Sequence, residues 1–444
     1  MPNTSASFTF AGHETNYKNG EITFSFELQT GNRLYSFKEK ILLSTKIEER
    51  SASSLRPILD TLLLALGVSY WKTYCPKHIV IKPFGLQKQQ ADFWNEVYTK
   101  GLGEFYYKNG IDFRGLVQFP YTENAANTVP MRGSRTDRSL VLLGGGKDSI
   151  VTAQLLKEHG KQFALFALNP VPLQDRTAGI LGARYITVTR TIDPQLFALN
   201  GVQGIYNGHV PISSIYACMG LLVAALYDYR YVIASNEASA NYGNVEYLGQ
   251  VVNHQWSKSI EFERFFQSYV ERHVTPDIKY FSLLRPIHEV EIVKLFTKYS
   301  QFFPIFSSCN RNFRLSGDPQ RSLWCGKCPK CAFVFLSLAA FLPKAQVMRI
   351  FGMNVLADGS LLEVYRELLG VKGFKPFECV GTPEESIWAF SQVIARGEYA
   401  NDVIASTLQP EVRKRSKSIR KEAVLGTSTD HAIPNQFQDF VHSL

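Results

Sequence analysis

The sequence predicts an α/β protein built on a doubly wound parallel sheet, with an N-terminal α+β segment and a mostly helical C-terminal segment. Between residues 139 and 343, short apolar runs typical of buried strands alternate with stretches of helical periodicity. This alternation is the pattern of a parallel sheet whose two faces are covered by helices. A glycine-rich turn joins the first of these strands to a helix, and ligands of such sheets bind where strands end. We therefore expect a ligand site at the carboxyl edge of the sheet.

The chain has 444 residues, which at about 150 residues per domain predicts two or three domains. We expect an N-terminal domain over 1–130, a sheet domain over 139–343 and a helical region over 344–444. Apolar residues make up 45% of the chain and charged residues 20%, which is typical of globular proteins and excludes a largely disordered one. Seven cysteines are too few for the disulfide framework of a secreted protein.

The N-terminal segment mixes strands and helices. A turn over residues 17–20, followed by alternating apolar and polar side chains, predicts a β-hairpin. Helical periodicity predicts one helix over 55–66, ending at Gly67, and another over 87–100. Residues 122–138 carry few large apolar side chains, so we expect a linker there.

The central segment carries the alternating strands and helices. In chain order we expect strand 139–143, helix 147–158, strand 163–168, strand 185–189, helix 211–226 and strand 231–235. A later helix over 260–270 places aromatic side chains on one face, which we interpret as core. Beyond about residue 345 the pattern is helical, and Thr382, Pro383 and Glu385 have the spacing of a capping box.

Charge and hydropathy bear on the partners of the protein. Residues 411–421 carry six basic side chains and one acidic one, which we interpret as a solvated, partly disordered stretch and not as a nucleic-acid footprint. The longest nearly apolar run, 332–342, is shorter than the roughly 20 residues of a membrane span. The N-terminus lacks the features of a signal peptide. We expect a soluble, cytoplasmic protein without a membrane or nucleic-acid partner.

The strongest motif is the turn before the first central helix, which reads Gly144, Gly145, Gly146, Lys147, Asp148 and Ser149. Its backbone N–H groups and the dipole of the following helix can hold a phosphate. We expect Lys147 to supply a mobile cation, Asp148 to hold Mg²⁺ and Ser149 to donate to phosphate. The motif is not a Walker loop, because Asp148 stands where Ser or Thr is needed. It is not a dinucleotide loop either, because Ser149 replaces the third glycine.

A cysteine cluster ends the central segment: Cys309, Cys325, Cys328 and Cys331, with the spacing C-x15-C-x2-C-x2-C. Four thiolates with two-residue gaps are typical of structural zinc, so we expect zinc there. A four-iron cluster is a rival interpretation, although the ferredoxin spacing is absent, and reduced cysteines without metal are a third. Three further cysteines are interpreted as small buried apolar residues: Cys75, Cys218 and Cys379.

Two polar stretches, 235–244 and 253–261, follow the strand expected at 231–235. Their asparagine, serine, histidine and lysine side chains suit an anionic, polyhydroxylated substrate at the carboxyl edge of the sheet. A solvated loop is the alternative interpretation. His209 precedes the helix over 211–226 and is placed to reach the same edge, although a single histidine is more often structural.

The glycine turn resembles the pyrophosphate loop of the N-type ATP pyrophosphatases, whose pattern is S-G-G-x-D-S. The match covers residues 145–149, and Gly144 stands in place of the serine. The resemblance implies an adenine-nucleotide α-hydrolase (PP-loop) fold and cleavage of ATP to AMP and pyrophosphate with Mg²⁺, which adenylates a carboxyl or carbonyl oxygen. The cysteine cluster resembles the zinc knot of the 7-cyano-7-deazaguanine synthases, which belong to the same group.

Five segments together resemble the ATP-dependent UDP-N-acetylmuramoyl-L-alanyl-L-glutamate epimerases (MurL). They are G-G-G-K-D-S at 144–149, N-E-A-S-A-N at 236–241, V-N-H-Q-W-S-K-S-I-E-F-E at 252–263, C-G-K-C-P-K-C at 325–331 and K-P-F-E-C-V-G-T at 375–382. The resemblance covers most of the chain. It implies inversion of the terminal L-glutamate of the nucleotide-linked dipeptide for peptidoglycan synthesis, and cooperation with the ligase that supplies this dipeptide.

The implied chemistry explains the need for ATP. Adenylation neutralises the α-carboxylate of glutamate, so that a base can remove the α-proton and an acid can return one to the opposite face. With Lys147 and Asp148 serving ATP, the candidates for the two proton transfers are His209, Cys218, Glu237, His254, Lys258 and Cys379. The alternatives are a deazaguanine-type nitrile synthase or a tRNA-modifying PP-loop enzyme that uses the basic stretch over 411–421. The N-terminal segment favours a substrate larger than a base.

Overall fold

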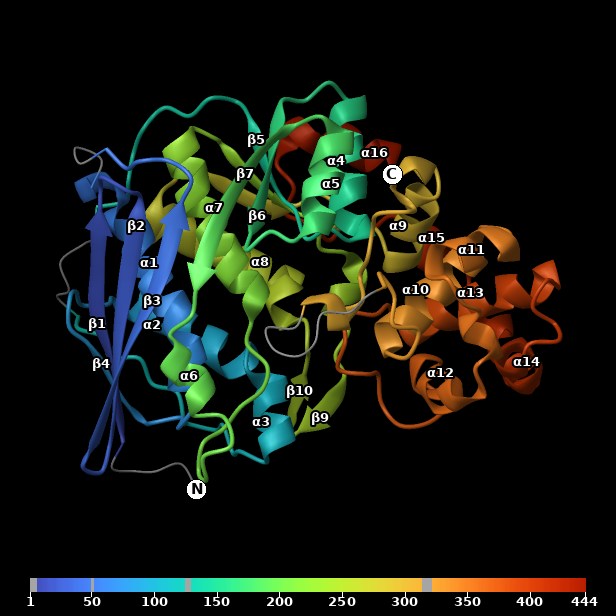
Figure 1. Ribbon diagram of the computed structural model, residues 1–444, viewed down its shortest axis with the longest axis horizontal. Coiled ribbons are helices and arrows are strands. Elements are labelled where there is room, and N and C mark those ends of the chain that lie inside the picture. The colour runs from blue at the N-terminus through green and yellow to red at the C-terminus, as the bar shows by residue number, and fades with distance from the viewer. Residues whose placement is uncertain (1–5, 49–51, 124–128, 314–321) are drawn as a thin grey trace.

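The computed structural model describes residues 6–48, 52–123, 129–313 and 322–444, and its centre is a nine-stranded sheet (Figure 1). The strands run in the order β11-β8-β5-β6-β7-β3-β2-β1-β4 across the sheet. Their bounds are β1 Ser7–Asn16, β2 Glu21–Thr30, β3 Arg33–Leu43, β4 His78–Ile81, β5 Ser139–Leu142, β6 Phe163–Leu168, β7 Arg184–Thr191, β8 Tyr231–Ala234 and β11 Lys279–Ser282. The five strands from β11 to β7 are parallel, which confirms the predicted parallel sheet in the central segment.

Helices cover both faces of the parallel strands, as the alternating pattern predicts. Successive residues point to opposite faces: Leu140 belongs to one buried core and Val141 to another. The first core contains side chains of α1 (Ala52–Trp71), α7 (Ile212–Tyr227) and α8 (Ile260–Tyr269). The second core contains side chains of α4 (Lys147–Glu158), α5 (Pro172–Leu181) and α9 (Glu289–Phe296).

The N-terminal strands extend the same sheet. β1 and β2 form the predicted hairpin around the turn at 17–20, and β3 pairs antiparallel with β7, with Leu42 opposite Thr189. A three-residue antiparallel ribbon, β9 (Val245–Tyr247) and β10 (Gln250–Val252), stands apart from this sheet. The linker predicted over 122–138 lies partly outside the described residues, and its described part contains no helix or strand.

One predicted helix boundary is wrong. α1 continues through Gly67 to Trp71, because this glycine serves close packing and not helix termination. A Cβ at Gly67 would lie 2.3 Å from Cε1 of Phe10, so that only glycine lets the helix approach β1. The second predicted helix is confirmed as α2 (Lys88–Lys100), which leads into α3 (Gly103–Asn109).

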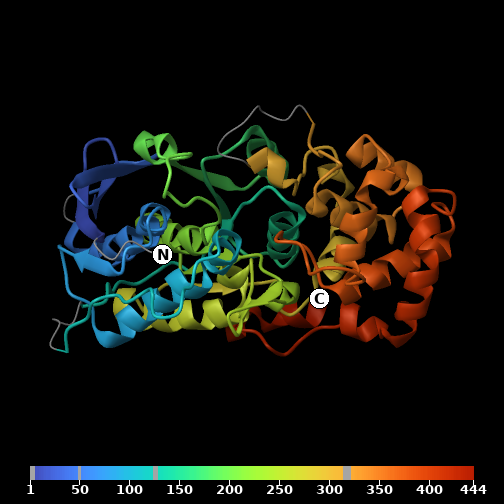
Figure 2. The same cartoon turned by 90° about the horizontal axis from the view of Figure 1, so that it is seen from below.

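The C-terminal part is helical, as predicted. It comprises α10 Pro329–Ala339, α11 Lys344–Phe351, α12 Leu362–Leu368, α13 Pro383–Arg396, α14 Val403–Arg415, α15 Lys421–Leu425 and α16 Gln438–Ser443. The capping box is confirmed: Thr382 Oγ1 accepts from the Glu385 N–H, and the Glu385 carboxylate accepts from the Thr382 N–H. In both views, the N-terminal strands and helices α10 to α14 lie at opposite ends of an elongated molecule, whereas α16 lies beside the central sheet (Figures 1 and 2).

The basic stretch over 411–421 differs from the expectation of a partly disordered segment. Its first half completes α14, where Val412 is buried, and its last residue opens α15. The apolar side chains on one face of α14 hold it against the rest of the helical part, so the basic side chains are carried on folded helices. Among the described helices, none is long and apolar enough to cross a membrane.

Candidate active site

The loops after β5, β8 and β11 meet at the carboxyl edge of the sheet, where the sequence predicts the site. Close packing shapes the glycine turn after β5. Gly145 has a φ of +81°, and a Cβ there would lie 2.2 Å from Leu173 Cδ2. A Cβ at Gly146 would lie 2.9 Å from Ser308 Oγ. Gly144 is different, because a Cβ there would meet none of the described atoms within 4 Å.

The start of α4 has the properties of an anion site. Its free N–H groups and dipole face the turn, and the hydroxyl of Ser308 lies against it without a hydrogen-bond partner among the described residues. A buried donor without a partner, beside a helix N-terminus, fits a phosphate oxygen. Ser149 donates to the carbonyl of Gly146 at 3.1 Å, so its hydroxyl is engaged in the turn. The carboxylate of Asp148 is 26% exposed and open to a metal ion.

Lys147 is not the mobile cation that the sequence suggests. Its side chain is fully buried, and Nζ donates to Asp148 Oδ1 at 2.6 Å and to Glu289 Oε1 at 2.7 Å. Burial alone would disfavour the ammonium, but the two carboxylates outweigh it and raise the pKa of Lys147. The two ion pairs therefore fix the position of its ammonium group beneath the surface, next to the glycine turn.

Glu289 connects this loop to the cysteine cluster. Its Oε1 also accepts a hydrogen bond from Lys330 Nζ at 2.7 Å, so one buried carboxylate oxygen lies between two buried ammonium groups. Burial would raise the pKa of Glu289, but Lys147 and Lys330 lower it well below its usual range. Lys330 Nζ also donates to the backbone carbonyl of Cys379. A chain of buried contacts thus runs from α4 to Cys379.

Cys379 lies between two cationic donors. Lys258 Nζ is 3.4 Å from Cys379 Sγ, and the imidazole of His254 hydrogen-bonds the same sulfur. Burial opposes ionisation of the thiol, but the charge of Lys258 and the hydrogen bond with His254 lower its pKa to about 5. Cys379 is therefore a thiolate at neutral pH, and it remains partly exposed. Burial disfavours the ammonium of Lys258, yet Cys379 and Glu237 raise its pKa well above the usual range.

Glu104 of α3 holds the two histidines of the site. Its Oε2 accepts from Nδ1 of His254 and lies 3.3 Å from Nδ1 of His209. Burial disfavours the imidazolium of His254, but the hydrogen bonds with Cys379 and Glu104 raise its pKa to about 9. Burial and the charge of His254 lower the pKa of His209 to about 3, so this ring is neutral. The pKa of Glu104 falls to about 2, because the contacts with both histidines outweigh its burial.

Glu237 follows β8 and is buried, with 3% of its surface exposed. Burial and the nearby charge of Glu289 raise its pKa to about 8, so Glu237 carries a proton at neutral pH. Its backbone is fixed by Arg285, whose guanidinium donates to the carbonyls of Glu237 at 2.7 Å and Lys258 at 2.5 Å. Arg285 is in turn paired at 2.9 Å with the buried carboxylate of Glu263.

The structure therefore brings together Lys147, Asp148, His209, Glu237, His254, Lys258 and Cys379. It removes Cys218 from the candidates, because this side chain lies within the apolar core of α7 and burial raises the pKa of its thiol. It overturns the interpretation of Cys379 as a small apolar residue, since charged groups surround it. Cys75 is buried in the core, as expected.

Sequence reasoning missed Glu104, Glu289 and Arg285. No local motif marks them, because their partners lie on other elements far along the chain. Lys330 lies between Cys328 and Cys331 in the chain, but its contact with Glu289 forms only in the fold and has no local signal.

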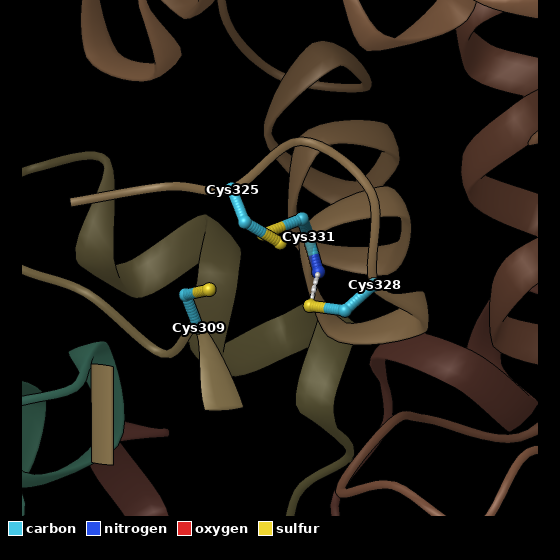
Figure 3. Close-up of side chains that lie close together, drawn as sticks. All are labelled: Cys309, Cys325, Cys328 and Cys331. Atoms are coloured by element: carbon cyan, nitrogen blue, oxygen red, sulfur yellow. Dashed lines mark hydrogen bonds between the residues drawn. The ribbon is translucent and has the colours of Figure 1, made fainter. Parts of the chain in front are cut away.

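The four cysteines of the predicted cluster converge (Figure 3). Their sulfur atoms all lie within 4.8 Å of one another, and Sγ of Cys325 and Cys331 are 3.7 Å apart. The edge of a tetrahedron with Zn–S bonds of about 2.3 Å is roughly 3.8 Å, so the arrangement fits zinc. The Cys331 N–H donates to Cys328 Sγ at 3.4 Å, which positions the latter at the start of α10.

Comparisons with known proteins show which family the chain resembles. A family model described as the MurL N-terminal domain matches residues 1–283, and one described as the MurL C-terminal domain matches residues 305–423. The UDP-N-acetyl-alpha-D-muramoyl-L-alanyl-L-glutamate epimerase of Xanthomonas oryzae is 38% identical, over 86% of this chain and 85% of that protein. Proteins of the same name from Salinispora tropica and a Micromonospora species are both 35% identical, over 98% and 96% of this chain and 96% of each relative.

Proposed function

We propose that this chain, which belongs to the MurL family, inverts the terminal L-glutamate of UDP-N-acetyl-alpha-D-muramoyl-L-alanyl-L-glutamate to D-glutamate. The names of the three relatives support this substrate, and they favour an epimerase over a nitrile synthase or a tRNA-modifying enzyme. A role in peptidoglycan synthesis in the cytoplasm, beside the ligase that supplies the dipeptide, stays a prediction of the same proposal.

The observation that carries the proposal is a continuous set of contacts. It joins the glycine turn over residues 144–146, which we call the phosphate turn, to the side chains proposed for proton transfer. Lys147, Glu289 and Lys330 link α4 to Cys379, around which His254 and Lys258 gather. The proposed enzyme activates a carboxylate with a nucleotide and then exchanges a proton on the carbon bonded to that carboxylate. It therefore needs the nucleotide site and the acid and base groups side by side. A phosphate turn alone would not explain the cluster of charged groups around Cys379.

Activation comes first in the proposed sequence. The free α-carboxylate makes the adjacent C–H a very weak acid, because deprotonation would place a second negative charge beside the first. We propose that ATP, held at the turn over residues 144–146 in a PP-loop type of fold, is attacked by this carboxylate to give an acyl-adenylate and pyrophosphate. Asp148 would hold Mg²⁺, which neutralises triphosphate charge when bound. The buried ammonium of Lys147 stabilises negative charge at the turn.

Inversion then takes place at the α-carbon. The groups placed for proton transfer are Glu237, His254 and Lys258, together with Cys379. His209 lies behind His254 and positions it through the shared carboxylate of Glu104. Water then releases AMP and the D-glutamyl product. We also propose that the four-cysteine cluster holds a structural Zn²⁺, for which its geometry is suited.

The test measures two products in one incubation. In D₂O with ATP, Mg²⁺ and the L-glutamyl substrate, we expect one AMP for each turnover and deuterium at Cα of the D-glutamyl product. Without ATP, no label should enter. Asp148→Asn should lower turnover at least 100-fold, because an amide is a poor Mg²⁺ ligand. Asp112→Asn, at an exposed aspartate paired with Arg114, is the matched control and should leave turnover unchanged. Formation of ADP, or an unlabelled D-glutamyl product, would contradict the proposal.

A further inference from the structure

We propose that Cys379 is the base that removes the α-proton of the L-glutamyl residue, and that Glu237 is the acid that returns a proton to the opposite face. This inference rests on the function proposed above and names the two groups that the reaction needs. It selects Cys379 and Glu237 from the six candidates that the sequence leaves open.

The contacts of Cys379 are those of a reactive cysteine. Its sulfur accepts a hydrogen bond from Lys258 Nζ at 3.4 Å and another from His254. Behind His254, the carboxylate of Glu104 accepts from Nδ1 and fixes the orientation of the ring. A reactive group, a histidine beside it and a carboxylate behind the histidine form the arrangement that activates cysteine in many enzymes. Residue Cys379 is partly exposed as a whole and its sulfur faces charged groups, whereas Cys218 lies in the apolar core.

The position of Cys379 suits proton transfer next to an adenylate. Its backbone carbonyl accepts from Lys330 Nζ, which also donates to Glu289 Oε1 at 2.7 Å. The same oxygen accepts from Lys147 at the start of α4. Two buried ion pairs therefore fix the distance between Cys379 and the phosphate turn. In an acyl-adenylate held at the turn, Cα is bonded to the acyl carbon, and we place it on the side of the turn that faces Cys379.

The protonation states match the direction from L to D. A base must begin without a proton and an acid must begin with one. Cys379 begins as a thiolate, whereas burial and the charge of Glu289 raise the pKa of Glu237 to about 8 and keep its proton on. His254 and Lys258 are both protonated and act as donors. Lys258 links the two groups in space: its Nζ lies 3.4 Å from Cys379 Sγ, and Arg285 binds the backbone carbonyls of Lys258 and Glu237 at 2.5 and 2.7 Å. Its ammonium is thus placed to stabilise negative charge between them.

The step balances as follows. The Cα–H bond breaks, its proton forms an S–H bond on Cys379, and its electron pair enters the adjacent acyl group as an enolate. The O–H bond of Glu237 then breaks, its proton forms a new C–H bond on the opposite face of Cα, and the enolate returns to an acyl-adenylate. Hydrolysis consumes one water and releases AMP. Proton exchange with solvent returns Cys379 to the thiolate and Glu237 to the acid.

The test is a crossed exchange experiment on the whole protein with ATP, Mg²⁺ and D₂O. For Cys379→Ala and Cys379→Ser, the L-epimer should keep its α-hydrogen, while the D-epimer exchanges through Glu237 without inverting. For Glu237→Gln the pattern should reverse, so that the L-epimer exchanges and the D-epimer does not. Each variant should lose inversion by at least 100-fold and still release AMP, which a structural defect would not allow.

The outcomes separate this inference from the proposed function. Absence of AMP from the wild-type protein would contradict the function itself. Normal AMP release with unchanged exchange of the L-epimer in Cys379→Ala would overturn only the assignment of the base. A covalent adduct of substrate mass on Cys379, seen by mass spectrometry after acid quench, would also overturn it and assign the thiolate as a nucleophile. Lys258→Met should slow exchange of both epimers, because the ammonium serves the shared enolate.

Discussion

Cysteine serves two neighbouring regions of this protein in opposite ways. Three of the four cysteines of the cluster over 309–331 are buried, and the sulfur atoms face one another at distances that suit a metal ion. Cys379 is partly exposed and faces a lysine and a histidine instead. The comparison shows that the neighbours of a cysteine, and not its residue type, set the environment of its sulfur.

One lysine joins the two regions. Lys330 lies between Cys328 and Cys331 in the chain, and its Nζ contacts Glu289 and the carbonyl of Cys379. The cluster therefore positions a charge of the candidate active site in addition to holding the local fold. Substitutions in the cluster, at Cys379 or at the residues that join them can separate the effect on folding from the effect on the candidate active site.

The largest expected effect is at the cluster. Cys328→Ser should release the metal, expected at about one zinc per chain, and lower the free energy of unfolding by roughly 5 kcal/mol or more, because metal binding contributes to folding. Elemental analysis and thermal unfolding measure both. Cys379→Ser is the matched control for a lost thiol outside the cluster and should keep the metal. Iron with a visible absorption band in the wild type, or full metal content in Cys328→Ser, would refute the zinc assignment.

A smaller effect is expected between the regions. Glu289→Gln removes the one charge that two buried ammonium groups share, which should cost about 3–5 kcal/mol of stability and most of the activity. Urea unfolding measures the first and AMP release the second. In the C-terminal helices, Glu411 pairs at 2.6 Å with Arg415 and both side chains are more than a third exposed, so Glu411→Gln should leave stability nearly unchanged. Equal losses in the two variants would show that the link through Glu289 is not special.

The third prediction concerns the charge state of Cys379. Its alkylation by iodoacetamide should stay fast down to about pH 6 and fall to half near pH 5, because the charge of Lys258 and the hydrogen bond with His254 overcome burial and lower the pKa to about 5. An ordinary thiol is only a few per cent ionised at pH 7. Lys258→Met should move the midpoint upward by at least one pH unit, with the charge of Lys330 remaining. A midpoint near 9 in the wild type would contradict the thiolate.

The smallest effect is expected at the phosphate turn. Gly144→Ser restores the serine of the pyrophosphatase pattern at a position where a Cβ meets none of the described atoms within 4 Å, so stability should change by less than about 0.5 kcal/mol. Gly145→Ala is the contrasting variant, because its Cβ would lie 2.2 Å from Leu173 Cδ2 at a φ of +81°. Thermal unfolding should show a clear loss only for Gly145→Ala. Equal melting temperatures would mean that Leu173 moves aside.

The features that could be predicted from sequence are those that depend on residues within one short stretch of chain. The turn over 144–149 and the cluster over 309–331 carry their meaning in their spacing, and the capping box at Thr382 does so as well. The alternation of strands and helices was enough to predict the parallel sheet. The wrong end of α1 at Gly67 shows the limit, because a glycine that admits the ring of Phe10 looks the same in sequence as one that ends a helix.

The features that could not be predicted depend on contacts between distant elements. Glu104 meets His254 across 150 positions, and Glu289 meets Lys147 across 142, so no local pattern relates them. Cys218 and Cys379 are equivalent candidates in the sequence, and only the core around the first and the charges around the second distinguish them. Burial, and with it the pKa of each group, is a property of the folded chain.

The pairing of β3 with β7 has a consequence for the newborn chain. β3 is complete long before β7, because Lys40 pairs with Thr191 about 150 residues farther on. At roughly 5–20 residues per second, a ribosome needs about 8–30 seconds to make that distance. During this time one edge of the N-terminal hairpins is open to other nascent chains. Lys38 and Lys40 lie on β3, and charged side chains on an edge strand oppose its pairing with a strand of another chain. They therefore protect β3 from aggregation until β7 is synthesised.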